Sequence, residues 1–172
     1  MKILLHILAV LFATYSAAAQ MQKKEAFDVK LPVAEINDGA LIENADAKAI
    51  LKEVNINLFG KNNVLHTLTV LSGTTLGEKQ ETYYYMKLSS KDKTINIVRL
   101  LYKHDGKLYL EDSDGSFDIR DYYISCEGSD SCFPRLFYSD GRYIWSCRDT
   151  LVCIISDDEE NKCEITTSAI YE

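Results

Sequence analysis

The chain has 172 residues, a formal net charge of −7 at pH 7 and 47% hydrophobic residues. An acidic protein repels nucleic-acid phosphates and anionic membrane surfaces, so we expect no nucleic-acid partner. The length fits one domain with a substantial buried core. The sequence carries no catalytic, cofactor-binding or metal-binding motif, which favours a protein that is not an enzyme.

The first 19 residues are typical of a cleavable export signal. Lys2 gives a positive start, an apolar run extends to Phe12, and Ala17-x-Ala19 fits the small-residue pattern at which such signals are cleaved. The apolar run has about half of the ~20 residues that a membrane-spanning helix needs. We therefore expect a secreted or periplasmic protein whose residues 20–172 form a single β-rich domain without a transmembrane segment.

The next part of the chain predicts a short strand, a turn and one helix. Residues 27–31 alternate apolar and charged side chains, and Asn37-Asp38-Gly39 is typical of a turn. Asn44 is a suitable N-cap for a short alanine-rich helix over residues 45–52. Residues 53–59 then alternate again and predict a strand. The apolar face of that strand would consist of Val54, Ile56 and Leu58.

The rest of the chain predicts a series of short strands separated by turn residues. The expected strands cover residues 64–71, 81–89, 94–103, 107–111, 117–125, 142–148, 151–156 and 162–167. Turn signals recur about every ten residues, a spacing typical of all-β domains. Most loops are too short for the crossover that parallel strands require. We predict a mainly β fold in which an antiparallel meander forms a sandwich or a barrel-like sheet.

The cysteines predict a disulfide-stapled C-terminal third, over residues 126–163. They are Cys126, Cys132, Cys147, Cys153 and Cys163. In an exported protein such a cluster indicates disulfides, whereas the spacing within the first two pairs is too wide for a zinc knuckle. We expect Cys126 to bond with Cys132 across a short loop, and two of the other three to bond. The odd count leaves one thiol unpaired or bonded to another chain.

Tyrosines 83–85 are candidates for a ligand-binding face. Alternation along a strand places Tyr84 on one face and Tyr83 and Tyr85 on the other. If Tyr84 faces the core, Tyr83 and Tyr85 project outward together, and Tyr109 also points away from the apolar face of its strand. Exposed tyrosines offer a large contact area at a low entropic cost. Cross-strand aromatic pairing that only stabilises the sheet explains the same pattern.

Other conspicuous residues have ordinary structural explanations. His66 shares an apolar strand face and is predicted to be a core residue, while His104 is predicted to lie in an exposed turn before Asp105 and Gly106. Trp145 is predicted to pack in the core. The acidic runs at residues 111–115 and 157–160 are expected to be solvated turns, because the first fails the calcium-loop pattern and the second suits a hairpin loop.

Three functions agree with these observations. The first is an exported binding or interaction protein for an unknown protein or small molecule, which uses an exposed aromatic sheet face or loops. The second is a secreted hydrolase whose catalytic carboxylates come together only in the fold. The third is a structural or envelope-associated protein that is cross-linked through the odd cysteine. The lack of a catalytic constellation favours the first.

Overall fold

The computed structural model describes residues 30–60, 62–111, 119–129, 131–149, 151 and 163–169. The expected leader, most of the expected strand at 27–31 and the expected turn at 157–160 lie outside the described residues. At the start of the described part, Lys30 and Leu31 are not in a strand, contrary to prediction.

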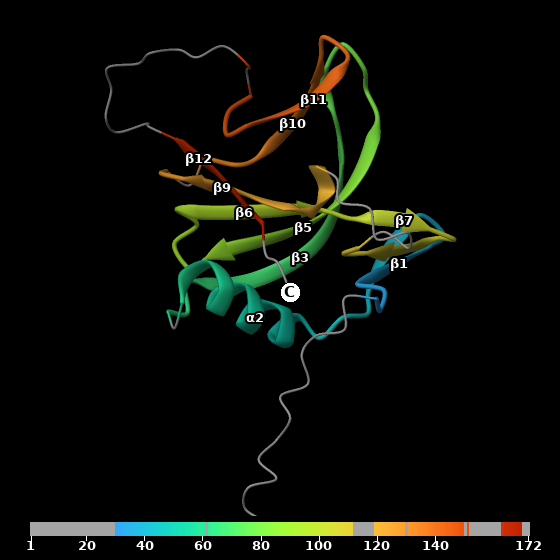
Figure 1. Ribbon diagram of the computed structural model, residues 1–172. Helices are drawn as coiled ribbons and strands as arrows, with labels where there is room; N and C mark the ends of the chain where they lie inside the picture. The colour runs from blue at the N-terminus through green and yellow to red at the C-terminus, as the bar shows by residue number, and fades with distance from the viewer. Residues whose placement is uncertain are drawn as a thin grey trace, which may run out of the picture.

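An open antiparallel sheet of five strands forms the centre of the molecule (Figure 1). The strand order is β12-β9-β6-β5-β3, and every neighbouring pair is antiparallel. The strands are β3 (Leu65–Thr74), β5 (Thr82–Ser90), β6 (Ile95–Leu100), β9 (Tyr122–Glu127) and β12 (Glu164–Ala169). The prediction of a mainly β, antiparallel fold with one helix is confirmed.

One face of this sheet is covered by the helix and by a second sheet, which together enclose the main core. The covering elements are α2 (Ala47–Phe59), β1 (Ala34–Asn37), β2 (Ala40–Glu43), β7 (Tyr102–His104) and β8 (Lys107–Tyr109). The four strands form a sheet of order β2-β1-β8-β7. Met86, Leu88 and Ile97 from the central sheet are fully buried against Ile50 and Val54 of α2.

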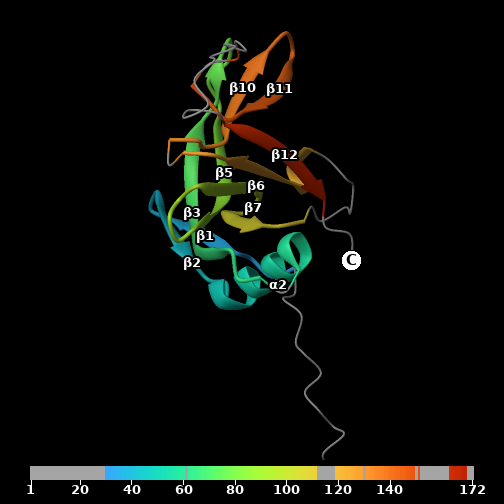
Figure 2. The same cartoon turned by 90° about the vertical axis from the view of Figure 1, so that its left-hand side faces the viewer.

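The opposite face is covered by a hairpin, as Figures 1 and 2 show above the central sheet. The hairpin consists of β10 (Arg135–Ser139) and β11 (Arg142–Ser146), and the short strand β4 (Leu76–Gly77) pairs with β10 in parallel. The parallel pair differs from the antiparallel pairing elsewhere in the described strands. A second apolar cluster fills the space between the hairpin and the sheet. The central sheet therefore has a core on each face.

Aspartate–glycine pairs make three tight hairpin turns. Both residues have positive φ in each turn, at Asp38 (49°) and Gly39 (79°), Asp105 (48°) and Gly106 (76°), and Asp140 (51°) and Gly141 (76°). A two-residue loop with positive φ at both positions matches the twist of the strands that it joins, and aspartate and glycine adopt that conformation most readily. The expected turns at residues 37–39 and 104–106 are confirmed.

The helix is longer than predicted, and the strand predicted at residues 53–59 is wrong. Helix α2 continues through Phe59, and its N-cap is Asp46, whose carboxylate accepts hydrogen bonds from the backbone N–H groups of Lys48 and Ala49 at 3.0 and 3.3 Å. Val54 and Leu58 are one helical turn apart and lie on one face, as four-residue spacing requires. Ile56, which the strand prediction placed beside them, is 41% exposed.

Asn55 ties the helix to the start of β3. Its side chain is buried, its Oδ1 accepts from the backbone N–H groups of Val64 and Leu65 at 2.8 Å each, and its Nδ2 donates to the carbonyl of Leu65 at 3.0 Å. One polar side chain on the buried face of α2 thus satisfies backbone groups of the incoming strand that have left water.

Replacing Asn55 with alanine is expected to lower the free energy of unfolding by about 3 kcal/mol, because the partners of Asn55 lose their hydrogen bonds inside the core. Chemical denaturation followed by circular dichroism measures the loss. Asn57→Ala is the matched control, since Asn57 is exposed on the same helix. A similar loss in both variants would show that helix propensity, and not the buried hydrogen bonds, decides the result.

Two predicted strands are interrupted in the structure. The expected strand at 94–103 is divided at Leu101 into β6 and β7, which belong to different sheets. The expected strand at 117–125 is preceded within the described residues by the 3₁₀ turn η1 (Ile119–Asp121) before β9 begins at Tyr122. The first interruption allows the chain to pass from the central sheet to the second sheet.

Candidate functional site

The face of Tyr83 and Tyr85, which was predicted to be exposed, is covered by another part of the same chain. Tyr83 and Tyr85 do share one face of β5, with ring centroids 5.4 Å apart. The β10–β11 hairpin covers that face, so that Tyr85 is 8% exposed and Tyr83 is half-buried. Trp145 of β11 packs edge-on against Tyr83 at 6.4 Å and is partly buried against the second apolar cluster, which agrees with the prediction that it packs on the core. Burial raises the pKa of both tyrosines.

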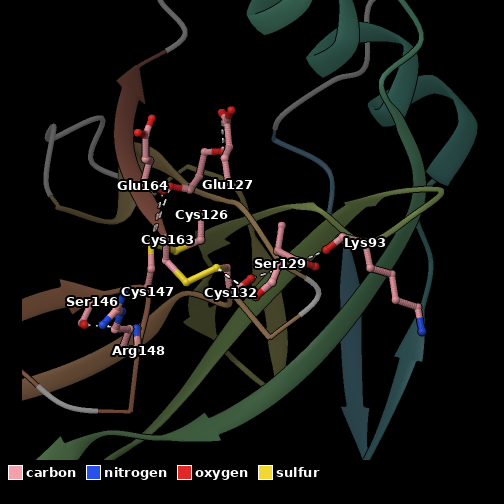
Figure 3. Close-up of a disulfide and its surroundings, with 12 residues drawn as sticks. Lys93, Cys126, Glu127, Ser129, Cys132, Ser146, Cys147, Arg148, Cys163 and Glu164 are labelled. Carbon is pink, nitrogen blue, oxygen red and sulfur yellow. Dashed lines mark hydrogen bonds between the residues drawn. A yellow bond between two sulfur atoms is a disulfide. The ribbon is translucent and has the colours of Figure 1, made fainter. Parts of the chain in front are cut away.

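Two disulfides fix the base of the hairpin to the central sheet, and their pairing corrects the prediction. Cys126 of β9 bonds with Cys147 after β11, and Cys132 before β10 bonds with Cys163 before β12 (Figure 3). The predicted Cys126–Cys132 bond is therefore wrong. A local loop closure was expected, but the two cysteines bond instead to residues 21 and 31 positions further along the chain.

The fifth cysteine has no partner left among the other four, because the two disulfides use all of them. Cys153 itself lies outside the described residues. Which of Cys147, Cys153 and Cys163 would bond was left open, and the structure bonds Cys147 and Cys163, each to a cysteine of the first pair. Formation of disulfides in the C-terminal third is confirmed.

A cleft of about 470 Å³ lies where the three sheets meet. The central sheet contributes the start of β5 and the end of β6, the second sheet contributes β7, and the hairpin contributes β10 and β11. The lining residues are Thr75, Glu81, Thr82, Tyr83, Tyr84, Leu100, Leu101, Lys103, Arg120, Leu136 and Tyr143. The break at Leu101 and the attached hairpin together create this concave surface.

The walls of the cleft combine aromatic, aliphatic and polar groups. Tyr83 is the one predicted ligand-face tyrosine in its lining, because Tyr85 is buried beneath the hairpin and Tyr109, half-buried on β8, lies outside. Leu100 of β6 and Leu136 of β10 lie in the lining and are buried together in the second apolar cluster. The hydroxyls of Thr75 and Tyr143 are engaged within the protein, whereas Thr82 is exposed. A lining that combines apolar and polar groups is found in sites for small molecules.

One carboxylate, Glu81, lines the cleft among the described residues, and it is already engaged. Its oxygens contact the Lys79 ammonium and accept a hydrogen bond from the Tyr143 hydroxyl. These two hydrogen bonds lower the pKa of Glu81, and the same contact with Glu81 raises the pKa of Lys79. Glu81 is therefore ionised at neutral pH, and the Lys79 ammonium balances its charge.

Two cations enter the cleft from elements outside the central sheet. Lys103 lies on β7, with its ammonium 5.5 Å from the ring centroid of Tyr84, and Arg120 lies in η1, with its guanidinium 4.4 Å from the ring centroid of Tyr102. Both distances are within the range of cation–π attraction. The rings hold the two cations at the margin of the apolar surface.

Neither His66 nor His104 lines this cleft. His66 is exposed, which corrects the prediction of a core residue. A β-bulge between Leu65 and Thr67 shifts the register by one residue, so that Leu65 points into the core in place of its neighbour. His104 is exposed in its turn, as predicted, with Nε2 3.3 Å from the carboxylate of Asp105.

His66 does line a second, more open hollow at the other end of the central sheet, with Ser90 and Asp92. The hydroxyl of Ser90 donates to Asp92 at 2.6 Å and accepts from the backbone N–H of Ile95, which makes it part of the β5–β6 turn. A histidine with a serine that is committed to a turn does not form a nucleophile–base pair.

In the described part of the chain, no three histidine, cysteine or acidic side chains come together in a group that would hold a metal ion. The same residues include no helix of the length and apolarity needed to cross a membrane. Of the expected acidic turn at 111–115, only Glu111 is described.

Comparison with known proteins found no family model, curated protein or solved structure that matches this chain.

Proposed function

We propose that this protein is an exported binding protein that holds a small molecule in the cleft at the junction of the three sheets. The observation that carries the proposal is the cleft itself, whose volume of about 470 Å³ and mixed aromatic, aliphatic and hydroxyl lining suit a ligand of drug-like size. The proposed binding surface is therefore the cleft, which includes Tyr83, and not the open sheet face of Tyr83 and Tyr85 that the sequence predicted.

The two disulfides support a location outside the reducing cytosol, because such bonds persist mainly in oxidising compartments. They agree with the export signal expected at the N-terminus. They also make the wall of the cleft stiff: the hairpin is bonded at its base, and near its tip the carboxylate of Glu78 accepts hydrogen bonds from Ser139 and Asp140. A rigid wall reduces the entropic cost of binding.

The alternative functions have less support. A carboxylate hydrolase needs two carboxyl groups that face one substrate, whereas Glu81 alone among the described residues supplies a carboxylate to the cleft. A cross-linked structural protein would depend on Cys153, which lies outside the described residues.

The test uses N-phenyl-1-naphthylamine, an uncharged aromatic probe whose fluorescence rises on leaving water. We expect saturable binding of about one probe per chain. Thr82→Trp is expected to weaken this binding by about tenfold or more, because a large side chain at an exposed lining position fills the cleft.

Thr69→Trp is the matched control, since Thr69 is an exposed strand residue that is not part of the lining. It should bind the probe like the unmodified protein. Absence of saturable binding, or equal weakening in both variants, would overturn the proposed site.

A further inference from the structure

Three basic side chains gather around one half-buried phenyl ring at the base of the hairpin. The Lys87 ammonium lies 4.7 Å from the centroid of the Phe133 ring, and the guanidinium carbon of Arg135 lies 5.4 Å from the same centroid. Both distances are within the range of cation–π attraction. Lys93, exposed in the turn between β5 and β6, is close enough for its charge to act on Lys87. We call Lys87, Lys93 and Arg135 the basic cluster.

The charge of the basic cluster is only partly balanced within the described part of the chain. Asp149 forms an ion pair with Nε of Arg135 at 2.9 Å, whereas neither lysine forms an ion pair with a described residue. Burial lowers the pKa of Lys87, and the charges of Lys93 and Arg135 lower it further. A chain with a net charge of −7 thus holds like charges together at this point. An anion placed among them offsets their repulsion.

A buried amide fixes the segments that carry the basic cluster. Asn96 is buried, and its Nδ2 donates to the backbone carbonyl of Lys93 at 2.9 Å and to that of Cys132 at 2.8 Å. Cys132 immediately precedes Phe133 and is held by one of the two disulfides. The turn of Lys93 and the segment of Phe133 therefore have a set separation before any ligand arrives, which reduces the entropic cost of binding.

The charge distribution favours a small anion over a large one. At an ionic strength of about 0.15 M, charges are screened beyond about 8 Å, so a small anion senses mainly the three cations that surround it. A long polyanion or an anionic membrane also meets the acidic remainder of the chain and is repelled there. Phosphate oxygens suit this set of donors, because lysine ammonium and arginine guanidinium groups both give them charge-assisted hydrogen bonds.

We propose that the basic cluster is a second binding site, for a small molecule that carries phosphate groups. The phosphate oxygens accept hydrogen bonds from the ammonium groups of Lys87 and Lys93 and from the terminal nitrogens of Arg135, while Asp149 keeps its contact with Nε. The site shares no residue with the lining of the cleft and adds a second ligand to the function proposed above.

Calorimetric titration with inorganic pyrophosphate tests this site. We expect saturable binding of about one pyrophosphate per chain at an ionic strength of about 0.15 M. Lys87→Met keeps an aliphatic side chain against Phe133 but removes the charge. It is expected to weaken binding about tenfold, as the loss of one charge-assisted hydrogen bond does. Circular dichroism checks that each variant keeps the fold.

Lys93→Asn is a second variant, at an exposed position that packs on no core residue. Lys93 has a positive φ of 62°, which asparagine adopts more readily than most residues, so the turn is preserved. This variant is expected to weaken pyrophosphate binding about threefold or more, because it removes one of the three cations.

Lys52→Met is the matched control, because Lys52 is exposed on α2, which covers the opposite face of the central sheet. It removes one positive charge from the chain and should bind pyrophosphate like the unmodified protein. Absence of saturable binding, or equal weakening in Lys87→Met and Lys52→Met, would overturn the site. Tighter binding of a heparin decasaccharide than of pyrophosphate would overturn its preference for a small phosphorylated molecule.

Discussion

Replacement of both Cys126 and Cys147 with alanine is expected to lower the free energy of unfolding by about 3 kcal/mol and the melting temperature by about 6 to 12 °C. The bond joins residues separated by 21 positions, so its loss frees a long loop in the unfolded chain. Cys126 is fully buried, and the alanine pair also leaves a small void under the hairpin.

The position of this bond gives the loss a local signature. Cys147 directly follows β11, and the bond to β9 attaches that strand to the central sheet. Trp145, the only tryptophan of the chain, lies two residues before it and packs against Tyr83. Loosening of the hairpin should therefore shift the emission of Trp145 to longer wavelength at temperatures at which circular dichroism still reports a folded sheet.

Two further samples separate the cross-link from the packing of the cysteine side chains. The Cys132→Ala and Cys163→Ala double variant should lose a similar amount, because that bond closes a separation of 31 residues. Fully reduced unmodified protein should lose at least as much as either double variant. Unchanged melting temperatures, or peptide mapping that finds a Cys126–Cys132 bond, would contradict the disulfide arrangement.

The tyrosine strand shows how far local alternation predicts a fold. It correctly separated Tyr84 from Tyr83 and Tyr85, because the side-chain period of a strand is a local property. It did not predict what covers each face, since that depends on residues more than fifty positions away. The missing element was β10, although Asp140-Gly141 between two stretches rich in aromatic residues is a recognisable hairpin signal.

The helix illustrates an ambiguity that sequence pattern alone does not resolve. Val54, Ile56 and Leu58 alternate as in a strand, yet Val54 and Leu58 are also one helical turn apart. Asn55, the neighbour of Val54 in the sequence, is also buried, and its side chain hydrogen-bonds to the backbone of Val64 and Leu65. A polar residue at this position favoured the two-residue alternation of a strand over the repeat of a helix. The burial of Asn55 could not be predicted locally, because its hydrogen-bond partners lie in another element.

The cleft was beyond prediction for a related reason. Its residues come from three sheets and from η1, and none of them forms a motif with its sequence neighbours. Lys103 and Arg120 are separated by a segment that includes residues outside the described part. Sequence analysis identified Tyr83 as a candidate but assigned it to an open face, because an exposed sheet was the simplest arrangement without the hairpin.

Replacement of Arg99 with leucine is expected to cost about 3 to 5 kcal/mol, the largest effect of any single substitution considered. Arg99 is 8% exposed, and its guanidinium joins three elements. Nη2 donates to the carbonyl of Leu110 at 2.9 Å and lies 3.6 Å from the carboxylate of Asp121, and Nη1 donates to the hydroxyl of Tyr123 at 3.2 Å. Leucine leaves these groups buried without their cation.

The same substitution is expected to loosen η1, which borders the cleft. Asp121 lies in η1 next to Arg120, so loosening η1 displaces one of the two cations that line the cleft. Arg99→Lys is expected to recover only part of the stability, because one ammonium cannot reproduce a planar fork that meets three partners. Arg142→Leu, at an exposed position of β11, should change the free energy of unfolding by less than about 0.5 kcal/mol. Denaturant midpoints measure all three, and full recovery by lysine would show that the charge alone, and not the guanidinium geometry, holds η1 in place.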